Sequence, residues 1–250
     1  MKNLKCLTSF HLKMMAMLFM LCDHMWATVV PAGNDWLTCI GRLAYPIFAF
    51  QISESFAHVP DDAFKKFIGK MFIWALITEI PFDLMYGGTC FYPFHQNVLF
   101  TYVIALALLW IAERARRKHW LAGLLAFIAC TGVGYVLGYI TFVDYYGCGI
   151  MMVLMFWYFR HFRCGWIAVI AGMVWINGFL LAGYTYDITL FGTTFAFPQQ
   201  AFALLALIPI FLYNGQRGRD SKVISFCCYA FYPAHILILY LISRFILIPS

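Results

Sequence analysis

Long apolar segments separated by short polar breaks run the whole length of the chain. Their lengths suit helices that cross a hydrocarbon core of about 30 Å. We predict helices near residues 10–30, 36–57, 67–86, 97–113, 119–138, 147–160, 165–185, 197–213 and 223–246. Turn-forming residues such as Gly87-Gly88 and Asn214-Gly215 lie between them. The pattern predicts an all-α polytopic transmembrane helical bundle of about nine spans.

The composition agrees with a membrane environment. Hydrophobic residues make up 64% of the chain and charged residues only 11%. A soluble domain of 250 residues cannot bury so much apolar surface. We therefore expect one transmembrane domain over residues 1–250, with the lipid bilayer as its main partner. The nine cysteines include no Cys-x-x-Cys pair, so we predict no metal site.

Lys and Arg are not spread evenly, and their positions predict the topology. They gather in every second connection, which is the positive-inside pattern. This places the N-terminus inside, in the cytoplasm, and the C-terminus outside. The net charge of +6 is explained by this arrangement, so we expect no nucleic acid as a partner. The clusters are Lys2 and Lys5; Lys65, Lys66 and Lys70; Arg114, Arg116, Arg117 and Lys118; Arg160 and Arg163; Arg217, Arg219 and Lys222.

Charged residues inside the predicted spans are candidates for a site, because a charge at the bilayer centre costs about 2.5 to 3.5 kcal/mol on insertion scales. Asp23 and Arg42 lie ten residues before and nine residues after Gly33, the centre of a predicted outer turn. At 1.5 Å per helical residue they reach a similar depth. We expect them to form an ion pair, either as part of a catalytic site or as a purely structural contact.

A second pair of acidic residues lies on the predicted third helix. Glu79 and Asp83 are four residues apart, so they share a face, and Pro81 between them frees a backbone carbonyl. Two neighbouring carboxylates resist joint ionisation and need a cation or a proton. Arg42 is the cation that we expect to join them in one network.

His24 is the candidate general base, since an imidazole titrates near neutral pH. His235, in the last predicted helix, either completes the site or hydrogen-bonds a backbone carbonyl. Gln96 and Asn97 begin the predicted fourth helix, where Asn97 suits an N-cap. The same amides also suit an oxyanion. Glu54 either contacts substrate or hydrogen-bonds a neighbouring helix.

Five blocks together resemble the TraX family of integral membrane proteins, named for a protein that N-acetylates F-type pilin. They keep their order from the first predicted helix to the last. The blocks are Leu21-Cys-Asp23-His24; Gly41-Arg42-Leu43-Ala-Tyr-Pro46-Ile-Phe48-Ala-Phe50 with Glu54; Thr78-Glu79-Ile-Pro81-Phe-Asp83; Gln96-Asn97-Val-Leu-Phe100-Thr101; and Phe231-Tyr232-Pro233-Ala-His235.

The resemblance implies an acyltransferase of the bacterial cytoplasmic (inner) membrane, with His24 at the position of the catalytic histidine. It implies acetyl-CoA as acyl donor and an amine or hydroxyl acceptor, which is a peptide, a pilin or a small molecule. Asp23, Arg42, Glu79 and Asp83 would support catalysis, and Gln96, Asn97, Glu54, Tyr232 and His235 would contact substrate. Cationic Arg116, Arg117, Lys65 and Lys66 suit the phosphates of the donor.

Two other functions remain open at the level of sequence. A proton-coupled secondary transporter also uses intramembrane Asp, Glu and His residues, although no inverted repeat is visible here. A membrane assembly protein explains the apolar segments but not the polar residues within them. Binding or hydrolysis of acetyl-CoA separates the three.

Overall fold

The structure, a computed structural model, describes residues 5–30, 32–190, 192–219 and 221–247. Helices dominate it, as predicted. The chain forms two compact units, which are described here one at a time. Unit 1 comprises Met1–Phe48 and Trp166–Ser221, and unit 2 comprises Ala49–Gly165 and Lys222–Ser250. Lys2 and Pro31, which the sequence places in a basic cluster and a turn, lie outside the described residues.

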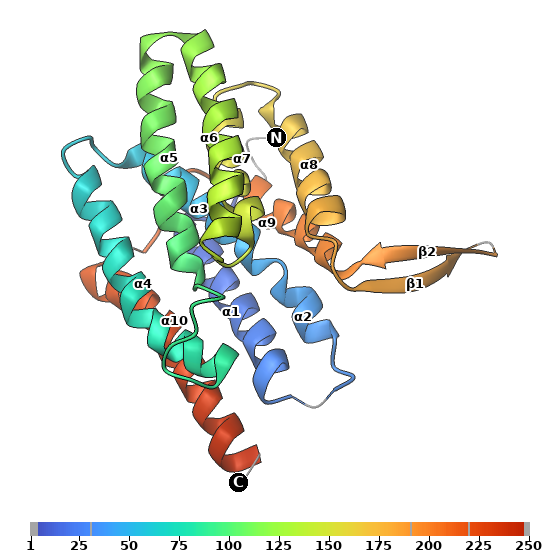
Figure 1. Ribbon diagram of the computed structural model, residues 1–250. Coiled ribbons are helices and arrows are strands. Elements are labelled where there is room, and N and C mark those ends of the chain that lie inside the picture. Colours follow the sequence, from blue (N-terminus) through green and yellow to red (C-terminus); the bar gives the residue numbers. More distant parts are fainter. Residues whose placement is uncertain (1–4, 31, 191, 220, 248–250) are drawn as a thin grey trace. The chain divides into compact units, whose positions relative to one another are not determined.

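Unit 1 contains the first helices of the chain, the helices between Trp166 and Ser221, and a β-hairpin (Figure 1). Thr8 caps α1 in a capping box with His11. The hairpin is antiparallel and pairs Thr185 with Pro198 at its base. The elements are α1 (Ser9–Thr28), α2 (Trp36–Gly41), the start of α3 (Ala44–His58), α8 (Gly165–Trp175) from Trp166 on, the π-helical turn η2 (Ile176–Leu180), β1 (Thr185–Leu190), β2 (Thr193–Pro198), the 3-10 helix η3 (Gln199–Ala206) and α9 (Leu207–Phe211).

Unit 2 contains the longest helices. In Figure 1, α5 lies beside α6, and α4 lies beside α10, in agreement with their contacts. The elements are α3 from Ala49 on, α4 (Phe64–Gly87), α5 (Val98–Lys118), α6 (Trp120–Ile140), α7 (Tyr146–Phe159), α10 (Lys222–Ile242) and the π-helical turn η4 (Ser243–Leu247).

The core of unit 2 is built around α7, which packs against α5 and α6. Trp157 of α7 is 1% exposed, and Met152, Val153 and Leu154 of the same helix are 0% exposed. Small residues allow the helices to approach closely: a Cβ on Gly138 of α6 would overlap the backbone of Gly147 in α7. Membrane helix pairs use small residues in this way.

The predicted helix 36–57 is in fact two helices. α2 ends at Gly41, Arg42 and Leu43 form a turn, and α3 begins at Ala44. Pro46 explains the break, because it has no N–H to donate to the carbonyl of Arg42, and proline is tolerated in the first turn of a helix. Arg42 therefore lies at a junction between helices rather than inside one.

The predicted helix 165–185 is also too long. Regular α-helix ends at Trp175, and the wider turn η2 follows. Asn177 in this turn is fully buried, donates to the carbonyl of Met173 at 3.0 Å and accepts from Gln200 at 3.0 Å. The predicted connection at residues 186–196 and the ends of the two predicted helices beside it contribute to the hairpin Thr185–Pro198.

Three helices of the described residues are long and apolar enough to cross a membrane, as judged by length and composition: Val98–Lys118, Trp120–Ile140 and the continuous segment Lys222–Leu247. Large apolar side chains are exposed on other helices too, for example Ile73 and Ile80 of α4. Such surfaces suit contact with lipid. Candidate membrane-spanning helices are thus present, while the nine spans and the orientation of the two termini stay predictions.

Candidate functional site

The first polar cluster lies in unit 1 and joins α1 to α2. We name Asp23, Thr38 and Arg42 the Asp23 cluster. Arg42 Nη2 lies 3.2 Å from Asp23 Oδ1, so the ion pair predicted from their common depth is present. Thr38 bridges the pair: its hydroxyl donates to Asp23 Oδ1 at 2.6 Å and accepts from Arg42 Nη2 at 2.6 Å. The cluster therefore fixes a charged carboxylate and a guanidinium in one geometry.

Close helix packing holds this cluster in place. A Cβ on Gly41 would overlap the side chain of Asp23, so only glycine lets α2 approach α1 here. Thr38 is fully buried, whereas the side chains of Asp23 and Arg42 are 23% and 22% exposed. His24, the next residue on α1, is half-buried, and its carbonyl accepts the Thr28 hydroxyl at 2.6 Å. The candidate base is thus adjacent in sequence to a rigid ion pair.

The second polar cluster lies in unit 2 and begins with Glu79 and Asn97. The backbone N–H of Asn97 donates to Glu79 Oε2 at 3.2 Å, and its side-chain amide donates both to this oxygen and to the carbonyl of Ala75. The side-chain oxygen Oδ1 of Asn97 accepts a hydrogen bond from the Leu99 N–H at 3.0 Å, which confirms the predicted N-cap of α5. Both amide hydrogens are therefore already used, so Asn97 can hold an oxyanion only if these bonds break.

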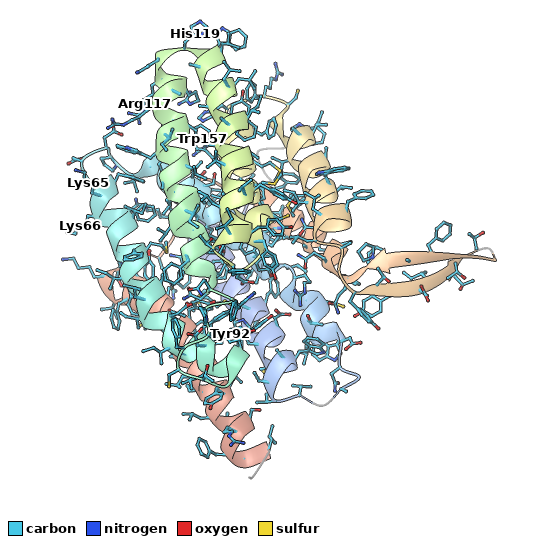
Figure 2. All side chains as sticks on the ribbon, in the orientation of Figure 1. Lys65, Lys66, Tyr92, Arg117, His119 and Trp157 are labelled. Atoms are coloured by element: carbon cyan, nitrogen blue, oxygen red, sulfur yellow. The ribbon has the colours of Figure 1, made fainter. Side chains whose placement is uncertain are left out.

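Asp83, one turn further along α4, is 1% exposed. Its Oδ2 accepts the backbone N–H of Tyr92 at 2.9 Å, and Figure 2 shows Tyr92 near the end of that helix. Asp83 Oδ1 and Glu79 Oε1 are buried without a hydrogen-bond partner among the described residues. No Lys or Arg in the described part of unit 2 forms an ion pair with either carboxyl group. The cluster thus retains unused acceptor oxygens.

His95 and Asp144 complete the second cluster, and nothing in the sequence singles out His95 as a site residue. His95 Nε2 lies 3.5 Å from Asp144 Oδ1. The imidazole ring stacks on Tyr86 with 4.3 Å between centroids and on Phe82 with 5.4 Å. His95 also interacts electrostatically with Glu79. We name Glu79, Asp83, His95, Asn97 and Asp144 the Glu79 cluster.

Asp144 is held by an unusual backbone. Phe142, Tyr145 and Tyr146 around it all have positive φ angles, of 53°, 59° and 47°. Non-glycine residues in this conformation are strained and occur often at functional sites. Thr101 donates to the Asp144 carbonyl at 2.7 Å, and the Tyr145 N–H donates to Asp144 Oδ1 at 3.0 Å. These bonds hold the acidic side chain beside His95.

The two clusters belong to different units, so the predicted network that joins Arg42 to Glu79 and Asp83 stays a prediction. Gln96, beside His95, lines an open cavity of about 520 Å³ in unit 2. The other lining residues include Phe94, Phe100 and Phe142, so the cavity is mainly apolar. Among the described residues, no three His, Cys, Asp or Glu side chains form a group that suits a metal ion.

His235 and Glu54 have the structural contacts that the sequence offered as alternatives. His235 is 6% exposed, and its Nδ1 lies 2.7 Å from the carbonyl oxygen of Phe231. Tyr232, also 6% exposed, lies on the same helix. Glu54 pairs with Arg160 at 3.1 Å and with His58 at 3.7 Å. A substrate contact for any of these residues stays a prediction.

The cations predicted for donor phosphates differ in their availability. Arg116 pairs with Glu113 at 2.8 Å, and Arg117 pairs with Asp61 at 2.8 Å and with Glu113. Lys65 and Lys66 are exposed at the start of α4, and Figure 2 shows them directed away from it. The two lysines can therefore receive an anion without first giving up a carboxylate.

Apolar helices of membrane-spanning length, together with charged clusters fixed between helices, define a helical membrane protein with internal polar sites. The family model described as TraX protein matches residues 9–243. The chain therefore belongs to the TraX family. No curated protein and no solved structure matches it.

Proposed function

We propose that this TraX-family protein is a membrane acyltransferase that moves an acetyl or related acyl group from CoA to an amine or hydroxyl acceptor. The observation that carries the proposal is the Asp23 cluster on α1 and α2, which fixes the residue that precedes His24 in the chain. A purely structural ion pair does not require an imidazole next to it, whereas acyl transfer requires a group that accepts a proton. The chain belongs to the TraX family, and acyl transfer is what its resemblance to that family implies.

His24 acts in this proposal as the general base. It takes the proton from the acceptor N–H or O–H while the nitrogen or oxygen attacks the thioester carbonyl carbon. The C–S bond then breaks, and the CoA thiolate leaves and receives the proton from His24. Asp23 and Arg42 set the electrostatic environment, and the bridging Thr38 keeps the two charges from changing position.

The donor is an anion, so its phosphates favour cationic surfaces. Lys65 and Lys66 are the favoured contacts because they are exposed and solvated. Arg116 and Arg117 contribute only if the phosphates compete with Glu113 and Asp61. We therefore expect the double variant Lys65→Ala, Lys66→Ala to lose more affinity for acetyl-CoA than the single variant Arg117→Ala.

The test compares wild type with His24→Ala in nanodiscs. We expect acetyl-CoA to raise the melting temperature of both, because ligand binding to the folded state alone stabilises it. Turnover should fall by about a hundredfold to ten-thousandfold in His24→Ala. His119→Asn is the matched control, since His119 is exposed and its side chain caps α6, a role that Asn retains. Full turnover in His24→Ala would remove this residue from the mechanism.

A proton-coupled transporter is the second candidate, and the Glu79 cluster favours it. Buried carboxyl oxygens that have no hydrogen-bond partner in the described part of the chain, beside a His–Asp pair, suit groups that exchange protons. Proton uptake into vesicles that contain the protein, driven by a substrate gradient and lost in Asp83→Asn, would support transport. Acetyl-CoA turnover without such uptake would support acyl transfer.

A further inference from the structure

The β-hairpin of unit 1 has two chemically different faces. The register places Tyr186 opposite Phe197 and Ile188 opposite Phe195 on one face. The other face carries Asp187 and the pair Thr189 and Thr194, whose hydroxyl groups lie 3.1 Å apart. Alternation along a strand directs these two sets to opposite sides. One face is therefore aromatic and aliphatic, and the other is mainly polar.

The apolar face is exposed away from the base of the hairpin. Ile188 is 39% exposed and Phe195 is 54% exposed. Nearer the base, Phe197 packs edge-on against Phe202 of η3, with 5.4 Å between ring centroids. Figure 1 shows that the hairpin extends sideways from the neighbouring helix α8 of the same unit. Within unit 1, its outer half thus presents large apolar side chains to the surroundings.

The near absence of charge around the hairpin indicates what kind of partner its apolar face contacts. Asp187 is the only charged residue between Arg163 and Arg217. A surface that docks on phosphates or on acidic peptides carries Lys or Arg, and this segment has none. Tyr184, at 65% exposure, adds an aromatic ring of the kind that gathers at membrane interfaces. Aromatic and aliphatic groups without cations suit the boundary between headgroups and hydrocarbon.

The backbone of the hairpin determines how deep it can lie in the membrane. A two-stranded sheet leaves N–H and C=O groups unpaired along both edges, and such edges do not occur in hydrocarbon. At the headgroup level, water and polar lipid groups satisfy them. The hairpin therefore suits the interface and not the bilayer centre. We propose that the hairpin Thr185–Pro198 lies on the membrane interface, with its Ile188 and Phe195 face inserted between lipid headgroups.

This placement affects the Asp23 cluster through the base of the hairpin. The Tyr186 hydroxyl accepts from Gln199 Nε2 at 2.8 Å and lies 3.4 Å from Cys39 Sγ of α2. Cys39 follows Thr38, the bridging residue of the cluster. A hairpin held at the interface thus fixes the depth of α2 in the membrane. The inference concerns membrane position and holds whether or not the protein transfers acyl groups.

Photo-crosslinking in nanodiscs of phosphatidylcholine tests this placement. p-Benzoylphenylalanine replaces Phe195 in one variant and Thr194, on the opposite face, in the matched control. We expect lipid adducts at Phe195 in mass spectra to be about fivefold more abundant than at Thr194, a ratio that corresponds to about 1 kcal/mol. Addition of anionic phosphatidylglycerol should change this ratio little, because the face has no cations.

Other outcomes overturn the proposal. Equal lipid adducts at both positions would show that the hairpin has no oriented face, and adducts at neither would place it in water. A crosslinked dimer at Phe195 would assign the face to a second copy of the chain. If the Phe195 variant does not fold, as judged by its melting temperature, the same substitution at Ile188 tests the same face.

Discussion

The contact between Asp23 and Arg42 gives the sharpest prediction about the structure. Asp23→Asn keeps an oxygen that accepts from Thr38, and Arg42→Gln removes the guanidinium. At 3.2 Å and an effective dielectric constant of about 20, the Coulomb energy of the pair has an upper bound of about 5 kcal/mol. Desolvation of two side chains that are mostly buried opposes it. We expect a coupling free energy of about 1 to 3 kcal/mol.

The assay is a double-mutant cycle on the free energy of unfolding in micelles, followed by circular dichroism. The pair Asp61 and Arg117 is the control, because its atoms are 2.8 Å apart but its side chains are 51% and 52% exposed. Its coupling should be about 0 to 1 kcal/mol. A swap of Asp23 and Arg42 should restore only part of the stability, since the side chain at position 23 lies directly against Gly41. Additive effects of Asp23→Asn and Arg42→Gln would refute the reasoning.

Three further measurements test other parts of the account. Asn97→Ala should destabilise the protein by about 2 to 4 kcal/mol in thermal or denaturant unfolding, because it removes the N-cap and two donated hydrogen bonds. Asn97→Asp keeps the N-cap but should also destabilise the protein, because it places a second carboxylate next to Glu79. Gly41→Ala should lower the melting temperature and weaken the Asp23 cluster, with Gly69→Ala, where a Cβ meets nothing, as the control. Burial and the nearby charges of Arg116 and Arg160 lower the pKa of His161 from 6.5, so the folded protein binds fewer protons than the unfolded chain. The free energy of unfolding should therefore fall as the pH drops below about 6.5. His161→Gln should reduce this pH dependence of the melting temperature, and an unchanged slope would contradict the assignment.

The sequence predicted the helical class because apolar periodicity is local and strong. It also predicted the contact between Asp23 and Arg42, since both residues lie at similar distances from one turn. The break at Arg42 was missed although Pro46 signals it, because the surrounding apolar residues suggested one continuous span. The hairpin was missed because residues 186–196 contain no Lys or Arg, a pattern that predicts an outer connection between two helices and does not indicate strands.

His95 illustrates what a single sequence does not reveal. Its partner Asp144 lies in a distant connection, and only folding brings α4, the start of α5 and the turn before α7 together in unit 2. The sequence singled out Glu79, Asp83 and Asn97 but gave no distance between them and His95. Backbone strain at Tyr145 and Tyr146 likewise depends on tertiary packing. Non-local contacts of this kind require the structure.

Acetyl transfer by the purified wild-type protein tests the central proposal most directly. The measurement follows the free CoA thiol and the labelled acetyl group together, in nanodiscs, with a panel of amines and hydroxyl compounds as acceptors. The account predicts that at least one acceptor is acetylated in the same amount as CoA is released, because one C–S bond breaks for each bond formed. Folded protein that releases no thiol above the protein-free background with any acceptor would contradict it.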